Sequence, residues 1–168
     1  MNDIEESETN LLTVFYSRTG TTRKVAESIS KAISCDLEEI VDTKNRAGPF
    51  GYITAGRDAA NGKLTVIREA RLDPSAYEIV VIGTPVWAGT MSTPVRTYIS
   101  QNRDRFKRVA LFCTCGGTDA DETLEAMKEL CGKPTVASVA IREKETKGEE
   151  YLQKITEFVN AMKSATGL

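Results

Sequence analysis

The sequence predicts an α/β domain with a doubly wound, five-stranded parallel sheet of strand order 2-1-3-4-5. Residues 11–16 form a nearly continuous apolar run, which is typical of a strand covered on both faces. Apolar residues then recur at helical spacing over residues 25–33, so the period changes from strand to helix. Apolar runs typical of strands and segments with helical spacing alternate along the rest of the chain. With 168 residues and 40% hydrophobic content, we expect a single domain over residues 10–168.

The other elements are expected in alternation after the first strand and helix. Residues 36–41 are less apolar than the first strand, which favours an edge position and hence the 2-1-3-4-5 order. The remaining strands are expected at residues 79–83, 109–113 and 135–141, and helices at residues 52–61, from Pro94, around residues 124–130 and over residues 151–162.

Composition excludes several classes of protein. The chain carries 22 Lys and Arg against 24 Asp and Glu, a net charge of -2, which indicates no nucleic-acid footprint. No apolar run approaches the length of a membrane span. The acidic N-terminus lacks the pattern of a secretory signal, so we expect a cytoplasmic protein with residues 1–9 as a disordered acidic arm. The four cysteines resemble no disulfide framework and are expected to be reduced thiols.

A hydroxyl-rich turn separates the first strand from the first helix. It comprises Ser17, Arg18, Thr19, Gly20, Thr21 and Thr22. The unpaired amides at the start of a helix attract anions, and the hydroxyls add donors that suit one terminal phosphate. The turn lacks the lysine of a triphosphate loop and the GxGxxG of a dinucleotide fold. The alternative interpretation is a Thr-rich helix cap without a ligand.

The segment from Tyr16 to Thr22, followed by Ala26, resembles the FMN-phosphate signature of flavodoxins. The resemblance extends in order from about residue 11 to residue 162. It implies a flavodoxin-like three-layer sandwich with FMN at the switch point of the sheet, for which flavodoxin is the standard example. The uninterrupted last strand resembles the short-chain members of the family. The nearly balanced charge departs from the strongly acidic surface of most electron-carrying flavodoxins.

A second candidate loop follows the third strand and contains the only tryptophan. Its candidate cofactor-binding residues are Thr84, Pro85, Val86, Trp87, Ala88 and Gly89. The indole is placed to flank an isoalloxazine ring; alternatively, it packs beneath its own loop. The resemblance implies that this loop supplies a peptide next to the flavin N5, for which Ala88-Gly89 is the candidate.

A third candidate loop follows the fourth strand, with Thr114, Cys115, Gly116 and Gly117 as candidate cofactor-binding residues. Adjacent glycines allow the backbone to approach a planar ligand. The resemblance implies that this loop contacts the flavin pyrimidine. A glycine-rich helix entry with Thr118 or Asp119 as N-cap explains the same residues without a ligand.

Residues 42–72 form an unusually long connection. Aromatic and arginine side chains in it, including Tyr52 and Arg57, are candidates to border a substrate site. The competing interpretation, which we favour from the sequence, is a solvated loop with a crossover helix. Breaks are expected at Gly48, Pro49 and Gly51.

No metal site is expected, because Cys113 and Cys115 are separated by one residue and the chain has no histidine. The absence of histidine also excludes the usual Ser/His and Cys/His nucleophiles. Cys115 lies in a loop expected to border the flavin, and its thiol is expected to be redox-sensitive if its thiolate is stabilised.

Two functional classes fit, with FMN as the chemical group and no catalytic side chain assigned. The first is an electron carrier that serves a redox partner protein. The second is an oxidoreductase that moves electrons from NAD(P)H to a quinone or another small acceptor. A flavodoxin fold that has lost its cofactor and serves as an interaction module is a third option. A homodimer is compatible with each of them.

Overall fold

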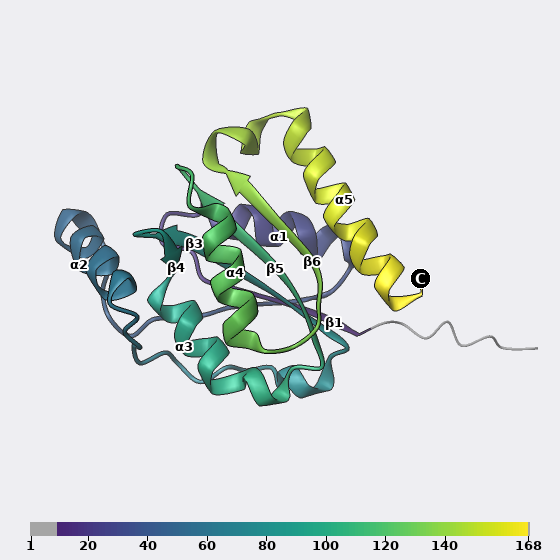
Figure 1. Cartoon of the computed structure of the whole chain (residues 1–168), viewed down its shortest axis with the longest axis horizontal. Coiled ribbons are helices and arrows are strands. Elements are labelled where there is room, and N and C mark those ends of the chain that lie inside the picture. The colour runs from purple at the N-terminus through teal and green to yellow at the C-terminus, as the bar shows by residue number, and fades with distance from the viewer. Residues whose placement is uncertain (1–9, 168) are drawn as a thin grey trace, which may run out of the picture.

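A parallel sheet forms the centre of the computed structural model, which describes residues 10–167 (Figure 1). The parallel strands follow the order β2-β1-β3-β5-β6, and a sixth strand, β4, pairs antiparallel with β3. The predicted α/β class and the predicted 2-1-3-4-5 order are confirmed, since β5 and β6 are the fourth and fifth parallel strands. The expected acidic arm, residues 1–9, lies outside the described residues.

Helices alternate with the strands along the described chain. The strands are β1 (Leu11–Phe15), β2 (Asp36–Glu39), β3 (Ile79–Trp87), β4 (Thr90–Met91), β5 (Arg108–Cys115) and β6 (Thr135–Arg142). The helices are α1 (Thr21–Ile33), α2 (Gly48–Ala60), α3 (Thr93–Asn102), α4 (Ala120–Cys131) and α5 (Glu149–Thr166), with short 3-10 turns at Pro74–Ala76, Arg103–Arg105 and Glu143–Lys147. None of these helices is long and apolar enough to cross a membrane.

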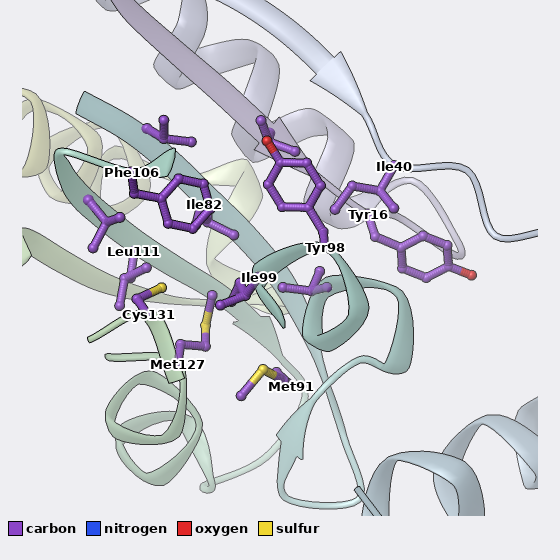
Figure 2. Packing of buried hydrophobic residues seen from close by; sticks show 14 of the residues in the cluster. Tyr16, Ile40, Ile82, Met91, Tyr98, Ile99, Phe106, Leu111, Met127 and Cys131 are labelled. Carbon is purple, nitrogen blue, oxygen red and sulfur yellow. The ribbon is translucent and has the colours of Figure 1, made fainter. Parts of the chain in front are cut away.

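Two apolar clusters, one on each face of the sheet, produce the three layers. The first packs residues of α3 and α4 against the sheet, and Figure 2 shows part of it, including Tyr98, Phe106 and Met127. The second packs α1 and α5 against the opposite face through residues such as Ile29 and Phe158. All five residues of β1 are buried, as a strand covered by helices on both faces requires.

The second predicted loop is largely a β-hairpin, and this corrects the expected end of the third strand at Gly83. β3 continues to Trp87, pairing with β5 as far as Pro85 and Thr114, and then turns into β4. Proline is tolerated here because β1 pairs with β3 only as far as Gly83, so Pro85 has no β1 partner to receive an amide hydrogen bond. β5 also extends past its expected end at residue 113 to Cys115.

The helix expected at residues 52–61 begins four residues earlier, at Gly48. Pro49 stands at the start of α2, where a missing amide hydrogen costs nothing. Gly51 is a packing residue, because a Cβ on it would overlap the backbone of Arg46. Pro49 and Gly51 were both expected to break the chain. Instead, Pro49 lies in the first turn of α2, and Gly51 allows the helix to pack against Arg46.

Candidate functional site

The turn between β1 and α1 presents unpaired amides, as expected. Gly20 adopts a left-handed backbone with φ of 104°, which side chains disfavour, and its amide donates to the Ser17 hydroxyl over 3.0 Å. Within residues 10–167, no acceptor receives the amides of Thr21, Thr22 and Arg23, the first three of the helix. This helix end is therefore suited to an anion.

The predicted hydroxyls divide into two pairs. Thr19 and Thr21 line a cavity and make no side-chain hydrogen bond with the described residues. Ser17 and Thr22 instead support the turn: Ser17 accepts from Gly20, and the Thr22 hydroxyl lies 2.8 Å from the Thr114 hydroxyl. Thr19 and Thr21 thus remain as side-chain donors for a ligand.

Arg18 belongs to the predicted loop, but its guanidinium points toward the start of α2. Its Nε donates to the carbonyl of Arg46 over 2.9 Å, and one Nη donates to the carbonyl of Gly48 over 3.1 Å. The guanidinium also lies 5.4 Å from the ring centre of Tyr52. Arg18 therefore ties the first loop to α2.

Trp87 is almost completely buried and packs on two neighbours. The Tyr16 ring meets it edge-on with centroids 5.4 Å apart, and the Arg46 guanidinium lies 5.5 Å from the centre of the indole. The indole still lines the cavity. After it, Ala88 and Gly89 both have positive φ, at 48° and 76°, as expected for a two-residue hairpin turn. Packing beneath the loop and facing the cavity are thus both features of this tryptophan.

At the third loop, Thr114 and Cys115 belong to the end of β5, and Gly116 begins the turn. A Cβ on Gly116 or Gly117 would meet no heavy atom within 4 Å, so the space beside both glycines is open. Burial raises the pKa of the Cys115 thiol, and burial raises that of Cys113 to about 12. The condition for a reactive Cys115, a stabilised thiolate, is not met.

A cavity of about 840 Å³ joins the three loops. Eleven of its lining residues were predicted: Arg18, Thr19, Thr21, Thr22, Pro85, Val86, Trp87, Ala88, Thr114, Cys115 and Gly116. Five other predicted residues lie outside the lining: Ser17, Gly20, Thr84, Gly89 and Gly117. Thr84 is buried, and its hydroxyl accepts the amide of Ser92 over 2.9 Å, which fixes the start of α3.

The remaining wall of the cavity comes from α2 and from the turn after β6. These residues are Tyr52, Ile53, Ala55, Gly56, Arg57 and Glu143. The sequence named Tyr52 and Arg57 as candidates but favoured a solvated loop. Arg68 and Arg71, from the same connection, line a different pocket beside β2. Only the α2 part of the connection reaches the site.

These features fit a mononucleotide better than a metal ion. Among residues 10–167, no group of three or more His, Cys, Asp or Glu side chains is placed to hold a metal. The cavity has the size of a small-molecule site and combines an anion-binding helix end with open glycines and an indole. A doubly wound sheet with such a site at the carboxyl ends of its strands defines the mononucleotide-binding class of α/β proteins.

Comparison with known proteins agrees with this class. The family model described as Flavodoxin matches residues 10–161, and the chain belongs to the flavodoxin family. No relative among curated proteins matches the chain.

Solved structures with the same fold include a flavoprotein from Lactobacillus acidophilus NCFM in complex with FMN, with a TM-score of 0.70 and 27% identity over 83% of this chain and 97% of that one. Oxidised flavodoxin 2 from Bacillus cereus has a TM-score of 0.61 and 17% identity, covering 93% and 99%. An NADH:FMN oxidoreductase in its apo form has a TM-score of 0.58 and 13% identity, covering 94% and 90%.

Proposed function

We propose that the chain binds FMN in the 840 Å³ cavity and acts in electron transfer as a flavodoxin-like redox protein. One observation carries the proposal: the three unpaired amides at the start of α1 adjoin the Thr19 and Thr21 hydroxyls at this cavity. Family membership and the FMN complex of the Lactobacillus flavoprotein support FMN as the ligand.

In this proposal, each wall of the cavity has a role in holding the cofactor. The amides of Thr21, Thr22 and Arg23, with the Thr19 and Thr21 hydroxyls, hold the phosphate. The hairpin residues 85–88 and the end of β5 at residues 114–116 border the ring. FMN supplies the electron-transfer chemistry when bound, and the chain binds and orients it.

Trp87 gives the ring a fixed neighbour. Tyr16 and Arg46 pack against the indole, so its position is set before any ligand arrives. Preorganised aromatic contacts lose little entropy on binding, which supports affinity for the ring. The neighbouring Cys113 and Cys115 thiols stay protonated at neutral pH because burial raises their pKa values.

A second candidate function is that of an FMN-dependent NAD(P)H:quinone, or similar acceptor, oxidoreductase. The observation that favours it is the α2 wall, where Tyr52, Ile53 and Arg57 extend the cavity beyond the three loops. An electron carrier needs no such wall, whereas an enzyme needs room for a small substrate. The likeness to the NADH:FMN oxidoreductase concerns the fold.

Two measurements test these proposals. Purified protein that takes up no added FMN, measured by flavin absorbance after desalting, would contradict FMN binding. With FMN loaded, rapid NADH or NADPH oxidation with a small quinone supports the oxidoreductase; electron exchange with a protein acceptor without such turnover supports the carrier. A redox partner protein, a cytoplasmic location and a possible homodimer remain part of the proposal.

A further inference from the structure

The α2 helix exposes a group of large apolar side chains beside the site. Phe50, Tyr52 and Ile53 are 79%, 68% and 65% exposed, although side chains of this kind are usually covered. Tyr52 and Ile53 also line the cavity. In Figure 1, α2 lies at one side of the molecule next to β4. The apolar surface therefore continues the cavity outward from the hairpin that carries Trp87.

The opposite face of α2 packs against the rest of the domain. Gly51 packs directly on the backbone of Arg46, and Ala55 and Ala59 are buried. The Arg46 side chain is itself buried, and its guanidinium donates to Asp42 over 2.6 Å and to Asp58, on α2, over 3.1 Å. A helix anchored by packing and buried ion pairs presents its outer face in a fixed position.

The α2 wall of the cavity carries a positive charge at Arg57. Arg57 lines the cavity and forms no ion pair or side-chain hydrogen bond with the described residues. The only acidic side chain in the lining is Glu143, on the turn after β6. The second arginine of the lining, Arg18, already donates to the carbonyls of Arg46 and Gly48. Arg57 is thus the guanidinium available to a ligand.

We propose that Tyr52, Ile53 and Arg57 form a second binding site, next to the FMN, for a small planar aromatic molecule that carries a carboxylate or sulfonate. Tyr52 and Ile53 contact the ring system of the ligand. The planar Arg57 guanidinium donates two hydrogen bonds to two oxygens of the anionic group. The phosphate of FMN has its own anchor at α1, which leaves Arg57 for the second molecule. This inference rests on the proposed function.

The test uses FMN-saturated protein and two redox-inert probes, 2-naphthalenesulfonate and the neutral 2-naphthol, in equilibrium dialysis. Arg57→Gln is expected to weaken sulfonate binding about tenfold, the scale of one charged hydrogen bond, and to change naphthol binding less than about twofold. Arg57→Lys keeps the charge but loses the planar guanidinium, so its sulfonate affinity should lie between those of the wild type and Arg57→Gln. Arg103→Gln removes the same charge from an exposed position outside every cavity described above and should change neither.

Three results would overturn the second site. The first is that the sulfonate does not bind the FMN-saturated wild type. The second is that Arg57→Gln weakens the binding of both probes equally. The third is that Arg57→Gln weakens FMN binding by a similar factor. The last result would mean that α2 serves the cofactor. A protein that takes up no FMN is recognised earlier, by missing flavin absorbance, and would contradict the proposed function together with this inference.

Discussion

The hydroxyls of Thr22 and Thr114 lie 2.8 Å apart in the interior, although 92 positions separate them in the sequence. Thr22 is the second residue of α1, and Thr114 stands near the end of β5. Both side chains are buried, so each hydroxyl depends on the other for a partner. This pair joins the first loop to the third and fixes the spacing between two walls of the cavity.

Thr22→Val should destabilise the fold by about 1 to 3 kcal/mol, because it leaves the buried Thr114 hydroxyl without a partner. The double variant with Thr114→Val should recover part of the loss, since both polar groups are then removed. Urea denaturation of the four proteins in the cycle measures the coupling. Strictly additive losses would contradict a direct hydrogen bond.

Gly51→Ala should destabilise the protein by about 1 to 3 kcal/mol, because the new Cβ overlaps the backbone of Arg46 and pushes α2 away. Gly56→Ala is the matched control on the same helix. A Cβ there meets nothing within 4 Å, so the change should be neutral or stabilising by up to about 1 kcal/mol. Thermal denaturation of both variants checks the difference, and equal effects would mean that α2 does not rest on Arg46.

Asp58→Asn should lower stability at neutral pH and lose its effect in acid. The hydrogen bond from Lys44 is the largest cause that lowers the pKa of Asp58 below 3.8. Desolvation of the carboxylate opposes this shift, and the hydrogen bond from Arg46 adds to it. A depressed carboxyl pKa stabilises the fold above the unfolded value, and that contribution disappears as the pH falls through the folded value. The difference in unfolding free energy between wild type and variant should therefore shrink below about pH 4. A difference that grows in acid would contradict the ion-pair assignment.

Alkylation at pH 7.5 should modify Cys35 before the other three cysteines. Cys35 is partly exposed, whereas Cys113, Cys115 and Cys131 are buried. Burial also raises the pKa values of these three thiols, which lowers the thiolate fraction that reacts. Iodoacetamide labelling followed by peptide mass spectrometry gives the order. Early labelling of Cys115 would restore its interpretation as a reactive thiol.

The sheet was predictable because its strands are short apolar runs with clear helical periods between them. The buried faces of α3 and α5 follow directly from such spacing, as Val95 and Tyr151 illustrate. The hairpin was not predicted because its second strand, β4, has only two residues. The hairpin forms because Val86 and Trp87 of β3 pair with Met91 and Thr90 of β4, which local propensity does not indicate.

The lining of the candidate cavity was predictable where it depends on a single turn. Thr19 and Thr21 follow from the sequence of one turn, but the engagement of Thr22 depends on a strand 92 positions away. The contribution of α2 could not be derived either, because the glycine that seats it, Gly51, is indistinguishable in sequence from a chain breaker.

The central claim is that the turn at residues 17–22 holds a phosphate, and affinity for FMN compared with riboflavin tests it most directly. Thr19→Val combined with Thr21→Val removes the two hydroxyls in the turn that line the cavity without a side-chain partner, and it leaves the Thr22–Thr114 pair intact. We expect FMN to bind about 100-fold more weakly by fluorescence titration and riboflavin to change less than about threefold. Equal losses for the two flavins would contradict the claim.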